Sequence, residues 1–391
     1  MSNLRSSVVR PVVNPFSSVP SNPVIPPEDL YTQLTADWPD LAALVESVGS
    51  PGYKHIHLYT NYKAKFEITL NAQAFKMITS DGVTYDTLGE VEHIWDAQQD
   101  IGSSYRWVII YRDWAGGPVS DSDAIGWCCS SEVCSKVTTW YYHFSGWNNL
   151  RTIIPVDTSL ITDFSYAFAD CYCLKTIPEI DTSGSTDFHY MFYYCKIMTT
   201  IPLIDTANGT NFSGMFYQTS ALAAIPLLNT EIGTNFYRMF YCSISLITVP
   251  KLNTQQATLV QEMFRGCINL DRVPDFSISG VYDFSGLFWD CANLKCGPSL
   301  SLSSGNNFYN MFYECLTLSD LDTTDPTAYA FDKNIHFNGA PIYLETMLII
   351  FNRLLAVASG TITISTYTNT RLTDEQRLLA THKGWTISIL D

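Results

Sequence analysis

The sequence predicts an α+β protein in which a solenoid of 24-residue repeats follows a β-sandwich-like module and precedes an α/β cap. Three observations predict this architecture. Phenylalanines recur at a strict interval of 24 residues, β-rich runs gather between residues 51 and 117, and a helix-and-strand pattern returns after residue 322. A unit of this length cannot bury its apolar face alone, whereas stacked units share one continuous core.

The composition fits a chain with a large buried core. Of the 391 residues, 46% are hydrophobic and 15% are charged, which excludes global disorder. The formal net charge of -16 would repel phosphate backbones, so we expect no nucleic-acid binding. No apolar run reaches the ~20 residues that a membrane span needs. Residues 1–27 lack the apolar core of a secretory signal, so we expect synthesis in the cytoplasm without export by the usual route.

Residues 1–50 read as two segments that precede the β-rich part. Residues 1–27 hold six prolines, a composition typical of an extended arm, and we expect this arm to anchor the chain. Residues 28–50 are predicted to be helical, with an interruption at Trp38-Pro39.

Residues 51–117 form the predicted β-sandwich module. Short runs with alternating polarity, such as HIHLYTN, AKFEITLN and YRWVIIY, favour antiparallel strands. A turn at Ser80-Asp81-Gly82, then EHIW, then YRWVIIY resembles the order of elements in a PKD-like module. Ser80 replaces the first glycine of that family's GDG turn, and Trp95 replaces the tyrosine of its H-x-Y strand.

The repeats are aligned on one phenylalanine per unit. Seven units follow one another without insertion, and Phe144 opens a degenerate unit before them. We expect the seven side chains to form one buried column, the structural core of the array: Phe168, Phe192, Phe216, Phe240, Phe264, Phe288 and Phe312.

Each unit predicts a helical turn followed by a short strand. In the first full unit, Phe164, Phe168 and Cys171 fall on one face of a helical turn. An Asp or Asn precedes the leading aromatic residue in six units, which is the preferred chemistry of a helix N-cap. Apolar residues around a proline such as Pro178, followed by Asp-Thr or Asn-Thr, favour a short strand that ends in an Asx turn.

The repeated pattern F-x-x-M-F-x-x-C-x-x-L-x-x-I-P-x-x-D-T resembles the BspA-like leucine-rich repeats of bacterial surface proteins and phage structural proteins. It covers roughly residues 140–322. The third unit has Thr219 in place of the cysteine, the fourth carries its thiol at Cys242, and the last two units lack Ile-Pro. The resemblance implies a leucine-rich-repeat solenoid, with a lead-in, over residues 118–322, and a surface-exposed adhesive role.

Residues 323–391 are predicted to cap the array, because the last unit of a solenoid would otherwise leave an unpaired edge. Leu344, Met347, Phe351 and Leu355 mark an amphipathic helix. The run TITIS predicts a strand, Thr373-x-x-Gln376 a capping box at the start of a second helix, and WTISIL a final strand.

No pattern of catalytic residues stands out, so we expect no enzyme, no cofactor and no metal ion. The chain lacks the G-x-S-x-G, Walker, H-E-x-x-H and G-x-G-x-x-G motifs. The repeated cysteines share one register of the units with no histidine beside them, which favours small buried side chains over a zinc site. The group Cys128, Cys129, Cys134 and His143 favours structural thiols or a local disulfide.

Two further patterns could each form a metal-binding site, although another role is favoured for both. His55 and His57 share one strand face, either as two ligands or, more often in such patterns, as an exposed face. Asp157, Asp181 and Asp205 occupy one register that continues as Asn and Ser. That register could hold calcium, but the substitutions favour capping of turns.

One register outside the core stays aromatic. Directly after the aligned phenylalanines stand Ala169, Tyr193, Tyr217, Tyr241, Arg265, Trp289 and Tyr313. These side chains either pack between units or form a partly exposed ladder, and both sugars and receptor loops bind such aromatic surfaces. The candidate binding residues are therefore Tyr193, Tyr217, Tyr241, Trp289 and Tyr313.

These observations and the resemblance together predict a non-enzymatic virion component of a tailed bacteriophage, a tail fibre, tip or receptor-binding protein. We expect a surface-exposed homo-oligomer that is assembled in the host cytoplasm. Its arm would bind other virion proteins, and its array would bind a glycan or protein receptor on the host. The alternatives, in order, are a bacterial surface adhesin of the same repeat family, a capsid decoration protein and a polysaccharide depolymerase.

Overall fold

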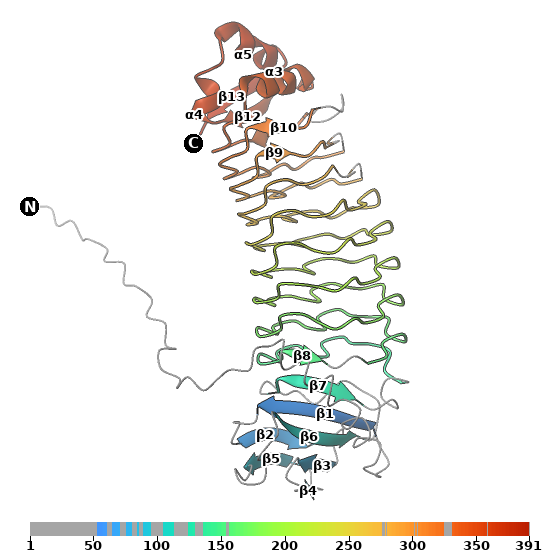
Figure 1. Ribbon diagram of the computed structural model, residues 1–391. Helices are drawn as coiled ribbons and strands as arrows, with labels where there is room; N and C mark the ends of the chain where they lie inside the picture. The colour runs from blue at the N-terminus through green and yellow to red at the C-terminus, as the bar shows by residue number, and fades with distance from the viewer. Residues whose placement is uncertain are drawn as a thin grey trace, which may run out of the picture.

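The computed structural model places three parts along one axis: a group of strands, a stack of coils and a cap of helices and strands (Figure 1). The expected arm, the helical segment at 28–50 and the turn at 80–82 lie outside the described residues. The structure describes residues 53–60, 65–70, 76–79, 84–85, 89–94, 105–112, 124–129, 136–153, 156–275, 278, 280–300, 302, 304–323, 331–357 and 359–390.

The described residues of the first part contain eight strands, most of them with the alternating polarity that the sequence shows. They are β1 (Tyr53–Thr60), β2 (Lys65–Leu70), β3 (Lys76–Thr79), β4 (Thr84–Tyr85), β5 (Gly89–Ile94), β6 (Tyr105–Arg112), β7 (Gly126–Cys129) and β8 (Thr152–Ile153).

These strands form a six-stranded sheet of order β4-β3-β6-β1-β7-β8 and a separate antiparallel pair, β2-β5. The pairs within the large sheet are antiparallel except β7 with β8, which run parallel. Strand β8 belongs to the first, degenerate repeat. The large sheet therefore crosses the boundary between residues 117 and 118 at which the sequence analysis separates module from array, and it gives the array its first paired edge.

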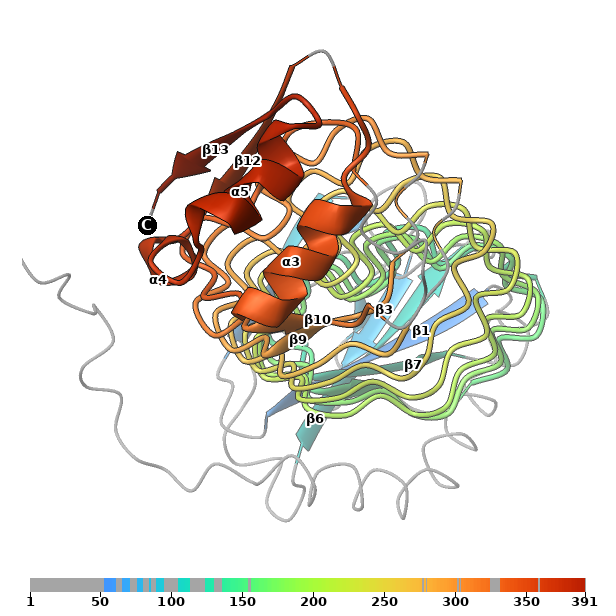
Figure 2. The ribbon, with the colours of Figure 1, turned by 90° about the horizontal axis from the view of Figure 1, so that it is seen from above.

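Between β8 and the cap, the chain winds into coils that lie over one another when seen along the stack (Figure 2). Parallel bridges join equivalent residues of adjacent units, as between Asp187 and Asn211, in a register shared by most units. A second line of bridges runs from Thr248 through Arg272 to Cys296 and on to the pair of β9 (Cys296–Gly297) with β10 (Asp320–Leu321).

The helical turn predicted in each unit is wrong: among the described residues between 136 and 323, none is helical. Instead, the backbone N–H groups of a unit alternate between acceptors in the following unit and acceptors in their own turn. The N–H groups of Phe164 and Phe168 donate to carbonyls of the following unit, at 3.1 and 2.9 Å. The intervening Ala167 donates to Phe164 within its own turn, at 3.1 Å. Successive turns place apolar residues on one side just as a helix would, so the spacing alone could not separate the two.

Left-handed residues make this alternation geometrically feasible. Two positions per unit, two residues before and two after the aligned phenylalanine, have a positive φ, for example 55° at Tyr166 and 60° at Asp170. The left-handed conformation costs a non-glycine residue roughly 1–2 kcal/mol. The N–H of each of these two residues donates across to the next unit, at 3.0 Å from Tyr166 and 2.8 Å from Asp170, which offsets the cost.

The seven aligned phenylalanines are fully buried and stack in one column. Their ring centroids lie 5.3 to 5.8 Å apart, with planes within 12° of parallel. Phe144 begins the column and Phe337, in the cap, ends it. A second column of buried rings runs beside it through Phe164, Phe188, Phe212 and Phe236.

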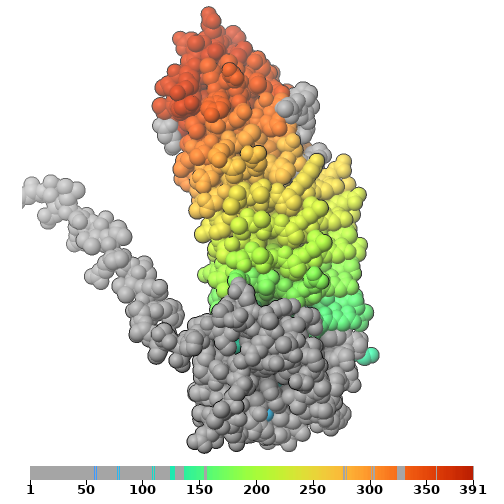
Figure 3. All heavy atoms as spheres, in the orientation of Figure 1, coloured from blue at the N-terminus to red at the C-terminus, as the bar shows by residue number. Residues whose placement is uncertain are grey.

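The cap closes the last unit with two layers. It comprises β11 (Ile335–His336), α3 (Leu344–Arg353), β12 (Gly360–Ile364), α4 (Thr366–Asn369), α5 (Asp374–Thr381) and β13 (Trp385–Ile389), with a parallel sheet of order β11-β12-β13. Thr373 and Gln376 form the capping box that the sequence predicts. The array and the cap share one continuous elongated surface, coloured from green to red in Figure 3. Within the described part of the chain, no helix is long and apolar enough to cross a membrane.

Candidate functional site: the aromatic face of the array

The candidate binding residues follow the core phenylalanines directly, and the turn geometry brings them to the surface. Tyr193, Tyr217, Tyr241, Trp289 and Tyr313 are all partly buried and partly exposed, whereas the phenylalanine before each is fully buried. Ala169, in the same register, is buried. The exposed register therefore begins at Tyr193.

These side chains form an unbroken ladder over six units. The ring centroids of Tyr193 and Tyr217 lie 5.0 Å apart, and those of Tyr217 and Tyr241 lie 4.6 Å apart with planes only 5° from parallel. Arg265 fills the fourth step, with its guanidinium carbon 5.5 Å from the Tyr241 centroid and 3.5 Å from that of Trp289. Trp289 then meets Tyr313 edge to face, at 5.6 Å.

The stacking determines which part of each ring is exposed at the surface. Because Tyr217 and Tyr241 cover one another's faces, what they present outward is ring edges and hydroxyl groups. Burial and the neighbouring tyrosines raise the pKa of Tyr217 to about 12, so the hydroxyl stays protonated at neutral pH. The ladder thus packs units together and also exposes a row of edges, and its binding role remains a prediction.

A second aromatic column, which the sequence analysis did not single out, widens this face. Tyr142, Tyr166 and Tyr190 stack two residues before the core phenylalanines, with centroids 4.3 and 5.0 Å apart. The next unit has Gly214 there, and a Cβ at Gly214 would lie 2.2 Å from the Tyr190 ring. The missing side chain lets Tyr190 lie over Gly214 and approach Tyr217, at 6.3 Å.

Two arginines share one carboxylate beside the ladder. Arg238 donates from Nε to Glu262 at 2.5 Å, and Arg265 donates from Nη1 to the other carboxylate oxygen of Glu262. The Arg238 guanidinium also lies 4.8 Å from the Tyr237 centroid and 5.2 Å from that of Tyr241. This network holds both cations against aromatic rings, a contact that the ring quadrupole favours.

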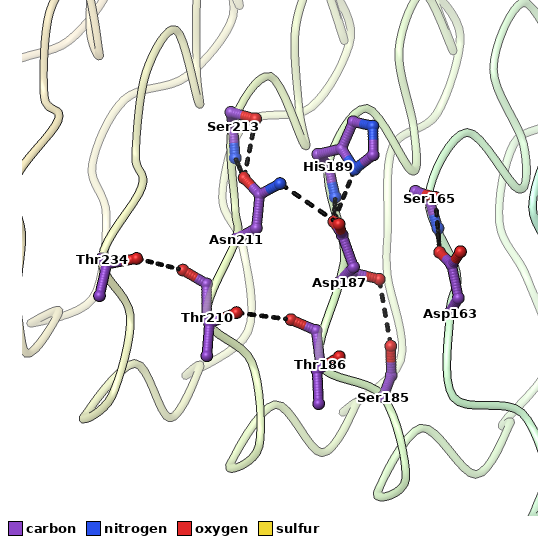
Figure 4. Close-up of polar contacts among 10 residues, drawn as sticks. All are labelled: Asp163, Ser165, Ser185, Thr186, Asp187, His189, Thr210, Asn211, Ser213 and Thr234. Carbon is purple, nitrogen blue, oxygen red and sulfur yellow. Dashed lines mark hydrogen bonds and ion pairs between the residues drawn. The ribbon is translucent and has the colours of Figure 1, made fainter.

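A polar strip borders the aromatic face where each turn begins (Figure 4). Asp187 accepts hydrogen bonds from the backbone N–H of His189 at 2.9 Å and from Asn211 at 3.3 Å, and its carboxylate lies 2.6 Å from the His189 ring nitrogen. Threonine hydroxyl groups form hydrogen bonds between adjacent units. The hydroxyl of Thr210, for example, donates to the Thr186 carbonyl at 3.2 Å. The predicted N-cap residues thus cap turns rather than helices.

The acidic register at Asp157, Asp181 and Asp205 also caps turns. Each carboxylate accepts a hydrogen bond from the backbone N–H two residues later, at 3.0, 2.9 and 2.9 Å. The asparagines that continue the register, Asn229 and Asn253, accept the same bond at 3.1 Å. The structure supports capping, the favoured of the two roles that the sequence left open.

The carboxylate of Asp187 makes the strip sensitive to acid. Burial alone would raise its pKa, but the hydrogen bonds from His189 and Asn211 outweigh burial and hold the pKa below its ordinary value. A carboxyl group whose pKa is lowered by folding stabilises the fold at pH values above its unfolded pKa of about 4. That contribution is lost as the pH falls through the pKa of the folded state.

We expect Asp187→Asn to lower the free energy of unfolding by about 0.5–1 kcal/mol at neutral pH, and to have a smaller effect near pH 3. The asparagine keeps the turn cap, as Asn211 does in the next unit, and removes only the charge. The side chain is 33% exposed, so solvent screening keeps the value small. Urea unfolding at the two pH values checks this, and an equal deficit at both would contradict it.

The thiols of the repeated cysteine register are structural. Five cysteines are buried in one register, and each donates to the carbonyl of the aligned phenylalanine of the preceding unit, as Cys267 does to Phe240 at 3.0 Å. Burial raises the pKa of the Cys267 thiol, which disfavours the reactive thiolate. The members of the register are Cys171, Cys195, Cys267, Cys291 and Cys315. Ser243 takes this place in the fourth unit and donates to Phe216 at 2.6 Å.

Of the other candidate ligands, His57 and His143 have described side chains, and both are buried among aromatic rings. His57 is fully buried with its ring 4.9 Å from that of Trp147, so the expectation of an exposed strand face is wrong for this residue. His143 is buried and stacks on Trp140 at 5.0 Å. The side chains of His55, Cys128 and Cys129, and all of Cys134, lie outside the described residues. Among those described, no cluster of three His, Cys, Asp or Glu could hold a metal ion.

Comparison with known families places a match on the array. Residues 135–247 and 224–323 match the profile of a family described as Mycoplasma protein of unknown function, DUF285. The matched segments cover the repeats and leave out the β-rich segment at 51–117. A search of curated proteins found no match.

Proposed function

We propose that this chain is a non-enzymatic structural component of a bacteriophage virion, a tail fibre, tip or receptor-binding protein. The array would adhere to the host surface through its aromatic face. The BspA-like repeat pattern supports a surface role, and the family match to the same residues fits a repeat protein of that kind.

The observation that carries the proposal is the ladder from Tyr193 to Tyr313. Its rings are held in place by their own stacking, so little conformational entropy remains to be lost when a ligand binds. Tyrosine, tryptophan and arginine are also the residues that dominate binding energy at interfaces. All three occur in this one register.

The ladder favours one mode of contact. A flat sugar face stacks on an open ring face, and Tyr217 and Tyr241 have the faces between them occupied. Their edges and hydroxyl groups are what a ligand would meet, with the guanidinium of Arg265 as a further donor. A receptor rich in hydroxyl or carbonyl groups, such as a surface glycan or a loop backbone, suits this row.

A bacterial surface adhesin of the same repeat family is the second candidate. The observation that favours it is the family description, which names a bacterial genus rather than a virus. Both candidates use the array as a binding surface, and they differ in where the protein is displayed.

The test of the proposal separates packing from binding at the same rings. The double variant Tyr217→Phe/Tyr241→Phe keeps both rings and removes only their hydroxyl groups. We expect its melting temperature to match that of the unaltered chain, and its adsorption to host cells to fall at least about tenfold. Trp289→Ser removes one ring of the ladder and should lower both the melting temperature and the adsorption to host cells. Tyr367→Phe, in the cap beneath Arg371, is the matched control and should change neither.

Normal adsorption of both ladder variants would contradict the proposal. That result, together with a lower melting temperature for Trp289→Ser, would assign the ladder to packing between units and move the receptor site elsewhere on the chain.

A further inference from the structure

A surface hollow of about 670 Å³ is lined by residues that stand about half a repeat unit later in the sequence than the aromatic residues. It spans three consecutive units at the corner that follows the repeated proline. Its lining combines apolar and acidic side chains, including Ile180, Asp181, Leu203, Asp205 and Leu227.

Its apolar rim is unusual within the array. Leu203 and Leu227 stand in the same register of adjacent units, and they are 74% and 64% exposed. No other large hydrophobic side chain among the described residues is as exposed as either. The same register holds Glu179 in the preceding unit and Lys251 in the following one. Adjacent exposed leucines over a hollow mark a surface that gains stability when covered.

The hollow is also anionic. Asp181 and Asp205 each use one carboxylate oxygen to cap a turn, and neither forms an ion pair with a described residue. Hydrogen bonds from the side chain and backbone of Ser183 hold the pKa of Asp181 below its ordinary value, so it is charged at neutral pH. A cationic and apolar segment complements these features.

The chain itself contains such a segment. Residues 4–16, LRSSVVRPVVNPF, carry Arg5 and Arg10 among valines, leucine and phenylalanine, and the whole stretch 1–27 includes no Asp or Glu. In a chain of net charge -16, this is a local excess of positive charge. The six prolines of the same stretch predict an extended backbone, a form in which a segment can lie along the surface of a neighbouring copy.

We propose that residues 4–16 of one copy bind in the hollow at Leu203 and Leu227 of a second copy. The arginines would pair with Asp181 and Asp205, and the valines would cover the two leucines. This contact links copies through a surface separate from the aromatic face, so the face remains free for a receptor.

Sedimentation of the full chain over a range of concentrations and salt tests the contact. We expect self-association that weakens as salt rises, because exposed charge pairs are screened. Leu203→Ser/Leu227→Ser and Arg5→Gln/Arg10→Gln should each weaken it at least about tenfold without changing the melting temperature. Asp157→Asn, in the same acidic register outside the hollow, and Leu316→Ser, an exposed leucine elsewhere, are the controls.

Charge reversal identifies the two partners. Chains carrying Asp181→Lys/Asp205→Lys and chains carrying Arg5→Glu/Arg10→Glu should each fail to associate alone and should associate when mixed. A chain that is monomeric at every concentration would overturn the proposal. So would association that ignores the hollow variants, or a mixture that does not associate.

Discussion

Phe240→Ala is expected to lower the free energy of unfolding by about 3–5 kcal/mol. Phe240 is fully buried, and its ring stacks between those of Phe216 and Phe264 at 5.5 and 5.3 Å. Truncation therefore loses contacts with two neighbouring units and leaves a cavity that the stacked backbone cannot close. Denaturant unfolding monitored by circular dichroism measures the change. Tyr309→Ala, at a 61% exposed ring of the same array, should cost under about 1 kcal/mol.

A loss below about 1 kcal/mol for Phe240→Ala would contradict the buried column. Because each unit contacts mainly its neighbours, we expect the same cost at Phe216 within about 1 kcal/mol. Unequal costs at these two adjacent positions would show that the repeats are not equivalent in their packing.

Gly233→Ala is expected to destabilise the array by about 1–3 kcal/mol through overpacking. A Cβ at Gly233 would lie 2.7 Å from the ring of Phe236 and 3.0 Å from the ring of Phe212. Both rings belong to the second buried column and are themselves stacked at 5.5 Å, so neither can move freely. Thermal and denaturant unfolding of the variant measure the cost.

The fifth unit supplies the compensating change for this glycine. In the registers of Gly233 and Phe236 it carries Ala257 and Val260, both buried. In a Phe236→Val background, Gly233→Ala should therefore cost less than it does alone, with a coupling energy of about 1 kcal/mol or more. Strictly additive costs would show that the glycine is required for another reason.

Periodicity was sufficient to predict which residues are inside the array. A constant interval aligns Phe168 with Phe192 whatever the local backbone does, because burial depends only on which register faces inward. It could not predict the backbone of the turn. Residues such as Tyr190 and Glu262 adopt a left-handed φ because their N–H groups find acceptors in the next unit, an energy that no local propensity contains.

The candidate site, too, was predictable in its register but not in its contacts between units. The aromatic register was visible in the sequence, but its covered faces were not, since they depend on ring orientation between units. Arg238 and Glu262 occupy the same register of adjacent units, and this interval could have predicted their contact once stacking was assumed. The position of Tyr190 over Gly214 could not be predicted, because nothing in the spacing says which side chain takes the empty place.

The sheet before the array was only partly predictable. Short alternating runs indicated its strands, but β1 and β7 pair across the boundary between residues 117 and 118. That pairing joins Leu58 to Gly126, which are distant in the sequence and are not joined by a single turn. Register over such a distance is set by packing in three dimensions rather than by turn residues.

Electron microscopy of purified phage particles, labelled with an antibody against this chain, tests the central claim most directly. The proposed role predicts label at the tail of intact particles, because a receptor-binding protein must be accessible before infection. Label confined to the bacterial envelope, with none on particles, would contradict the account and establish the adhesin alternative. Label on the capsid alone would contradict the tail assignment.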